Sequence, residues 1–223
     1  MTSTALLLGS IGVLAETTDL QRRAFNTAFE RQGLSWHWDS ETYRALLEVP
    51  GGKARIRHYG LAKGKEVDVE TIYQNKLAAF EALLDAGVPL RPGIAELIAD
   101  ARARGVKVGF VTATHPRQVD MLLRAVQPTL RDDTFDFIGN TTFAPAPKPA
   151  PDIYIAALYA LGVPADHAVA IEDTPDSAQS ALAAGVRTYA YPGAGAAHRS
   201  FPKAVTVLDR PDAGLLPQRR AAA

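Results

Sequence analysis

The chain has 223 residues, of which 47% are apolar and 22% charged, so it is long enough to bury a substantial core. Its 24 basic side chains match its 24 acidic ones, so no overall charge favours nucleic acid or an anionic membrane as a partner. The absence of cysteine excludes disulfides, thiolate metal ligands and cysteine nucleophiles, and the cytoplasm is the expected compartment.

An apolar run covers residues 5–15. Residues 1–4 ahead of it carry no basic side chain, so we interpret the run as containing a buried first strand rather than a secretory signal. Charges, glycines or prolines interrupt every other apolar stretch before the roughly 20 residues that a membrane-spanning helix needs. No membrane partner is expected.

The first predicted elements are a strand at Ala5–Leu8 and a helix that follows it. The continuous apolar run of the strand, ended by Gly9, is typical of a parallel strand covered on both faces. Residues 18–21 fit a capping box, apolar side chains follow at helical spacing, and Gly33 supplies a helix stop. We therefore expect a strand that leads directly into a helical segment.

No strand signal appears between residues 35 and 64. A short helical pattern covers Tyr43–Leu47, and residues 51–53 open a second, basic helical stretch. Asp68 starts a longer helix that Gly87 ends. Residues 17–86 are therefore predicted to be an all-helical insert, or cap.

From Arg91 onward, helices and strands alternate. The first helix is expected to start at Pro92 and to end at Gly105. Alternation of this kind predicts an α/β fold with a doubly wound parallel sheet and right-handed crossovers, in which residues 1–16 and 87–223 form the core domain. The further predicted strands are Val106–Val111, Phe135–Ile138, Ala168–Ile171 and Arg187–Ala190, and the helices between them are 118–126, 151–161 and 176–184.

Ligands of open parallel sheets bind at the carboxyl ends of the strands, so the residues that follow each strand are the candidates for function. Four such segments stand out: residues 9–14, 112–114, 148–152 and 172–174. They offer hydroxyl groups, amides at a helix start and a lysine, which together can hold one phosphoryl group.

These four segments, in this order, resemble the four motifs of the haloacid dehalogenase superfamily. The chain is similar to the subgroup with a helical cap, which includes β-phosphoglucomutase and the CbbY-type xylulose-bisphosphate phosphatases. In that family the first motif holds two aspartates: one attacks the phosphoryl group, and the other protonates the leaving oxygen. Here Gly9 and Ile11 stand at those positions, while residues 12–16 are similar to the residues that follow the aspartates in the family.

The resemblance also assigns roles to other residues. It implies phosphate contacts from Thr112, Ala113, Thr114 and Lys148, substrate contacts from Glu16, Tyr43, Gly52, Lys53 and Arg55, and metal ligation by Glu172 and Asp173. Simpler interpretations remain open: Thr112 and the Asp173–Thr174 pair are also typical helix caps, Lys148 is also typical of solvated surface, and Gly52 and Lys53 are also typical of a flexible helix start.

The missing aspartates change the expected chemistry. Glycine has no side chain that could form an aspartyl phosphate, and isoleucine cannot donate a proton. Because side chains alternate along a strand, Ser10 is expected to point away from the face of positions 9 and 11. The acids Glu172 and Asp173 lie on another strand and would have to move to attack. No cofactor is expected to be required, and Mg²⁺ should bind weakly because one hard ligand is missing.

Three functions remain open. The chain can be a catalytically silent protein that keeps a pocket for phosphate or a small phosphorylated metabolite, which the retained Lys148 and Thr112 favour. It can also be an active phosphatase with a different nucleophile, or a protein-interaction scaffold with a vestigial pocket and a partner that the sequence does not name.

Overall fold

A computed structural model describes residues 3–49, 51–126, 130 and 133–217 of the chain. The chain falls into two compact units, one formed by Met1–Glu16 with Gly87–Ala223 and the other by Thr17–Ala86. Across the described ranges, no helix combines the length and the apolar character that crossing a membrane requires.

The first unit is built around a parallel sheet of six strands. The strand order is β3-β2-β1-β4-β5-β6, and every neighbouring pair is parallel. The doubly wound α/β fold predicted from the sequence is therefore confirmed. The strands are β1 (Ala5–Gly9), β2 (Lys107–Val111), β3 (Phe137–Ile138), β4 (Ala168–Glu172), β5 (Arg187–Ala190) and β6 (Thr206–Val207).

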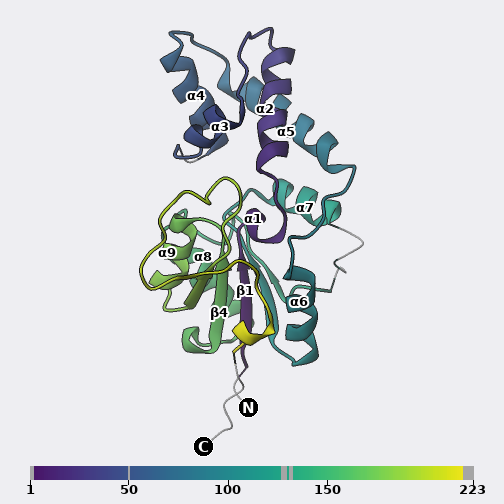
Figure 1. Ribbon diagram of the computed structural model, residues 1–223, viewed down its shortest axis with the longest axis vertical. Coiled ribbons are helices and arrows are strands. Elements are labelled where there is room, and N and C mark those ends of the chain that lie inside the picture. Colours follow the sequence, from purple (N-terminus) through teal and green to yellow (C-terminus); the bar gives the residue numbers. More distant parts are fainter. Residues whose placement is uncertain (1–2, 50, 127–129, 131–132, 218–223) are drawn as a thin grey trace, which may run out of the picture. The chain divides into compact units, whose positions relative to one another are not determined.

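Helices cover both faces of this sheet. Figure 1 shows α8 and α9 on one side of β1 and β4, and α6 and α7 on the other. On the first side, Leu7 of β1 packs with Tyr154 and Ala157 of α8 and with Ala181 of α9 in one buried cluster. The helical elements of this unit are α1 (Ile11–Leu14), α6 (Ile94–Ala103), α7 (Pro116–Ala125), α8 (Asp152–Leu161), α9 (Pro175–Ala183) and the 3₁₀ turns η1 (Ala165–His167) and η2 (Ala213–Leu215).

Strand β1 lies at the centre of the sheet, and its side chains are completely buried. Its register places Gly9 beside Val111 of β2 and Leu8 beside Ile171 of β4. The carboxyl ends of the three central strands are therefore level, and the residues that follow them meet at one edge of the sheet.

The second unit consists of α2 (Thr18–Arg31), α3 (Ser40–Leu46), α4 (Gly52–Ala62) and α5 (Val69–Leu84), and its described residues contain no strand. Aromatic side chains fill its core, with Phe25 and Phe29 against Trp38 at centroid distances of 4.7 and 4.8 Å. The Asn26 amide fixes the Trp38 backbone through two hydrogen bonds of 2.9 and 2.8 Å. This unit therefore has a core of its own, as an inserted domain needs.

Several local predictions were wrong. The residue that precedes α2 is Thr17, and its side chain makes no capping hydrogen bond, so the predicted capping box is not formed. Helix α6 begins at Ile94 rather than at Pro92. Strand β3 is two residues shorter than predicted, and neither the one-turn helix α1 nor the exposed two-residue strand β6 was predicted. Short elements such as these carry too few residues to show a period.

Candidate functional site

Side chains from the turn after β1, from the loop before α8 and from α8 meet at Glu172, the last residue of β4. The Glu172 side chain is fully buried. Its Oε1 atom accepts hydrogen bonds of 2.5 Å from Lys148 Nζ and 2.5 Å from the Tyr154 hydroxyl. Its Oε2 atom accepts a bond of 3.2 Å from Ser10 Oγ. One carboxylate therefore connects the turn after β1 with Lys148 and Tyr154, which lie much further along the chain.

Two contacts hold the Lys148 ammonium within this network. Only 7% of its side chain is exposed, and besides the ion pair with Glu172 it donates a bond of 3.0 Å to the Val111 carbonyl oxygen. The interpretation of Lys148 as solvated surface is therefore wrong. A buried ion pair of this kind contributes little net stability, but losing one partner leaves the other charge buried and unpaired.

Gly9 has no side chain, and the Glu172 carboxyl group occupies the volume that a side chain there would fill. A Cβ atom added at Gly9 would overlap the carboxyl carbon and both carboxyl oxygens of Glu172. The backbone of Gly9 lies in an ordinary strand, so the need for glycine here comes from volume and not from conformation. The carboxylate missing from β1 is thus replaced in space by one from β4.

Ser10 departs from the sequence prediction. It was expected to point away from the site, but its hydroxyl bonds to Glu172 and lies 3.1 Å from the Ser177 hydroxyl. The strand ends at Gly9, and Ser10 has a φ of 25°, the only positive φ of a non-glycine residue in the described part of the chain. The alternation of side chains along a strand does not extend to such a residue.

Asp173 follows Glu172 and faces the turn after β1. Desolvation, and next the negative charge of Glu172, raise the pKa of Asp173 to about 6, although Lys148 acts in the opposite direction. The residue is partly exposed, but its Oδ1 atom is buried without a hydrogen-bond partner among the described residues. A Cβ atom at Gly12 would overlap its carboxyl group. The turn thus admits Asp173 only because Gly12 is small.

The threonines after β2 lie beside this cluster in the sheet. Thr112 is 1% exposed, and its hydroxyl donates a bond of 2.7 Å to that of Thr114. Thr112 does not cap a helix, because the cap of α7 is His115, whose Nδ1 accepts from the Arg117 amide. The cap of α9 is Thr174. The capping interpretation is therefore wrong for Thr112, whereas for the Asp173–Thr174 pair it is confirmed through Thr174.

The family model of haloacid dehalogenase-like hydrolases matches residues 6–185. The chain belongs to this family. It is 40% identical over 209 residues to the protein CbbY of Cereibacter sphaeroides, covering 92% of this chain and 91% of that one. It is 35% identical over 132 residues to a phosphoglycolate phosphatase of Rhodospirillum rubrum, where the match covers 57% of this chain and 53% of the relative.

Solved structures of the family agree. The crystal structure of CbbY from Rhodobacter sphaeroides in complex with phosphate superposes with a TM-score of 0.82 at 38% identity, covering 94% of this chain and 95% of that one. A CbbY mutant in complex with xylulose bisphosphate matches equally well. The resemblance stated from the motifs is confirmed at the level of the family and of its CbbY branch.

Phosphatases of the haloacid dehalogenase family typically use Mg²⁺. The described residues do not complete such a site, since among them no group of three or more His, Cys, Asp or Glu is arranged to hold a metal ion. Glu172 Oε1 already accepts two hydrogen bonds and Oε2 one, whereas Asp173 Oδ1 is buried without a hydrogen-bond partner among the described residues. Magnesium prefers about six oxygen ligands, so weak Mg²⁺ binding stays a prediction.

The residues predicted to contact a substrate from the cap side have partners within their own units. Arg55 Nε donates to the Leu46 and Val49 carbonyl oxygens at 3.1 and 2.9 Å, and burial lowers the pKa of its guanidinium. Lys53 forms an exposed ion pair of 2.6 Å with Glu70.

The other predicted substrate contacts are also occupied by the protein itself. Burial raises the pKa of Tyr43, and a Cβ atom at Gly52 would meet the Tyr73 ring. In the core unit, Glu16 accepts a bond of 2.7 Å from the Ala194 amide.

Sequence reasoning missed three residues of note. Tyr154 lies in the predicted helix 151–161 and was given no role of its own, yet its hydroxyl donates to Glu172. Arg91 donates to the Gly12, Tyr191 and Pro192 carbonyl oxygens at 2.7, 2.7 and 2.8 Å and so braces the turn after β1. Lys76 lies 3% exposed in the cap core, where it donates to Gln21. The position of Lys76 on the apolar face of α5 could have indicated that this lysine is buried.

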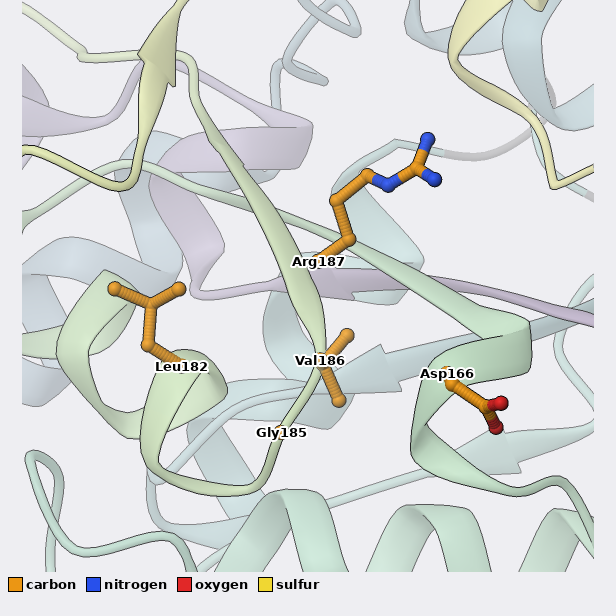
Figure 2. Close-up of a pocket in the computed structure, with 5 residues that line it drawn as sticks. All are labelled: Asp166, Leu182, Gly185, Val186 and Arg187. Carbon is orange, nitrogen blue, oxygen red and sulfur yellow. The ribbon is translucent and has the colours of Figure 1, made fainter.

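A shallow pocket of about 490 Å³ lies elsewhere on the core unit. Figure 2 shows its lining residues, which come from η1, from the end of α9 and from the start of β5. These are the amino ends of the strands, opposite to the edge where Glu172 lies. The pocket therefore forms no part of the cluster around Glu172, and its lining consists of Asp166, Leu182, Gly185, Val186 and Arg187.

Proposed function

We propose that the chain is a catalytically silent haloacid dehalogenase-like protein that binds phosphate or a small phosphorylated metabolite at the cluster around Glu172. The observation that carries the proposal is the position of Glu172, whose carboxyl group fills the volume of the absent side chain at position 9. Gly9 and Ile11 then stand where active relatives hold their two aspartates. Turnover through an aspartyl phosphate is impossible with these residues.

Glu172 does not take over the nucleophile's role. Its side chain is fully buried, and three donors hold its two oxygens. Attack on phosphorus needs an exposed oxygen in line with the leaving group, and Glu172 would have to leave Lys148 and Tyr154 to provide one. It therefore acts as a structural substitute for the missing carboxylate.

Phosphate binding is supported by the donors that remain. Thr112, the Ala113 and Thr114 amides and Lys148 are of the type that holds an oxyanion. CbbY, which shares most of its length with this chain, has been crystallised with phosphate and, as a mutant, with xylulose bisphosphate. Because Lys148 already pairs with Glu172, the pocket is less positive than the sequence alone suggested. We therefore expect modest affinity for a free anion.

The proposed partner is a small phosphorylated molecule, with no role for nucleic acid or membrane, and the proposed compartment is the cytoplasm. The formal net charge of zero fits a local anion site better than a broad polyanion surface. A protein-interaction role with a vestigial pocket becomes the better account if no phosphorylated ligand binds.

Calorimetric titration with phosphate and with xylulose bisphosphate tests the proposal. Binding to the wild type, its loss in Lys148→Ala and its retention in the exposed control Lys203→Ala are the expected results. Circular dichroism of each variant checks the fold, since Lys148→Ala leaves Glu172 unpaired. Absence of binding in a folded wild-type protein, or binding that is indifferent to Lys148→Ala, would contradict the proposal.

A further inference from the structure

The corner left by Gly9 contains a hydroxyl group beside a carboxylate. Ser10 Oγ donates to Glu172 Oε2 at 3.2 Å, while Lys148 binds the other oxygen of the same carboxylate. A hydroxyl within hydrogen-bond reach of a base that a third group orients is the arrangement of an activated nucleophile. In a chain with an aspartate at position 9, Glu172 could not occupy its present place beside Ser10.

Ser10 is also the accessible member of the group. Glu172 and Tyr154 are fully buried, whereas Ser10 is partly exposed at the end of β1. Its φ of 25° turns the residue out of the strand direction, and its hydroxyl is held by both Glu172 and Ser177. Backbone strain of this kind persists only where the surrounding structure holds it.

From this geometry we infer that Ser10 accepts one phosphoryl group from an acyl phosphate and retains it as a phosphoserine. The inference rests on the proposed phosphate pocket, and it adds a modification site to it. Ser10 Oγ attacks phosphorus, and its proton passes to Glu172 Oε2. The bond between phosphorus and the bridging oxygen of the donor breaks, and the electron pair leaves with the carboxylate of the donor.

The class of donor follows from Ile11. An alcohol leaving group, as in a sugar phosphate, needs a proton in the transition state, and Ile11 cannot supply one. A carboxylate leaves without a proton, because its pKa lies near 4. An acyl phosphate is therefore the donor that this corner can use.

The phosphoserine formed in this step is expected to persist. A phosphoserine is a phosphate monoester, one of the slowest classes of compound to hydrolyse without catalysis. Hydrolysis would require a water in line with the serine oxygen on the opposite side of phosphorus and a base to activate it, and Gly9 and Ile11 offer no carboxylate for that role. One phosphoryl group per chain, without further turnover, agrees with a protein that is silent as a phosphatase.

Incubation with acetyl phosphate, followed by intact-mass and tandem mass spectrometry, tests the inference. We expect one phosphoryl group on Ser10, stable to hydroxylamine and labile in alkali, and none when glucose 6-phosphate replaces acetyl phosphate. Ser10→Gly should abolish the label without loss of thermal stability, because glycine accepts a positive φ. Glu172→Gln should slow labelling by about 100-fold, and the exposed control Ser200→Ala should label like the wild type.

The outcomes separate the two claims. A hydroxylamine-labile phosphoryl group would place the label on Glu172 or Asp173 and overturn the role of Ser10, as would labelling that survives in Ser10→Gly. Failure to label a protein that still binds phosphate in the calorimeter would also overturn that role, but it would leave the proposed function intact. Failure of both measurements would contradict the proposed function itself.

Discussion

The Glu172 carboxyl group lies in the volume that a side chain at position 9 would occupy, so Gly9 and Glu172 are sterically coupled across neighbouring strands. Gly9→Ala should displace Glu172 from Lys148 and Tyr154 and lower the free energy of unfolding by about 1–3 kcal/mol. Urea unfolding measures this loss. In a Glu172→Ala background the same change should cost much less, and additive effects of the two substitutions would show that the residues are not coupled.

The affinity for phosphate should depend on the Glu172 charge. Glu172→Gln keeps the shape of the side chain and removes the negative charge that neutralises Lys148. We expect the affinity for phosphate to rise by about tenfold, which corresponds to about 1.4 kcal/mol. Calorimetric titration of both proteins measures the change. Equal or weaker binding by Glu172→Gln would mean that Lys148 does not contact the anion.

Stability should respond to the ionisation of Asp173. Its pKa is raised from 3.8 to about 6 in the folded state, so the folded protein binds more protons than the unfolded chain between these values. The penalty of the charged carboxyl is absent below pH 4 and complete above pH 6. Asp173→Asn should therefore gain stability relative to the wild type as pH rises through this window, by at most about 3 kcal/mol. Urea unfolding at pH 4 and pH 7 gives the comparison, and a constant difference between the two proteins would contradict it.

Lys76 should give the cap the opposite kind of pH dependence. Its pKa is lowered from 10.5 to about 7, chiefly by desolvation and then by the Arg55 charge, and its ammonium lies 5.2 and 4.7 Å from the Phe25 and Phe80 ring centroids. The folded state thus binds fewer protons than the unfolded chain, and stability rises with pH between about 7 and 10. Lys76→Met should raise the melting temperature at pH 6 and have less effect at pH 9. A larger gain at pH 9 would refute this assignment.

The sequence was sufficient for the architecture. The continuous apolar run of β1 and the helical spacing of apolar residues in α5 are both visible in the sequence, and the order of strands and helices then restricts the topology. The four segments at the strand ends were found in the same way, because parallel strands bring their carboxyl ends together. Short elements such as α1 and β6 have no period to detect.

The chemistry of the cluster was less predictable. The position of Ser10 depends on a single φ angle, and the rule of alternating side chains gave the wrong direction for it. The partners of Glu172 come from three segments, and a sequence shows side-chain types without showing which of them share one carboxylate. Lys148 was predicted to contact phosphate, and that role stays a prediction, but its ion pair with Glu172 was not foreseen.

The central claim is that this chain keeps the pocket of its family without the turnover. The most direct measurement is the steady-state release of phosphate from xylulose bisphosphate with millimolar Mg²⁺, using protein whose binding of that ligand has been established by calorimetry. We predict no release above the blank, because the loss of the nucleophile alone costs several orders of magnitude. Sustained release that disappears in Asp173→Ala or in Ser10→Gly would contradict the account.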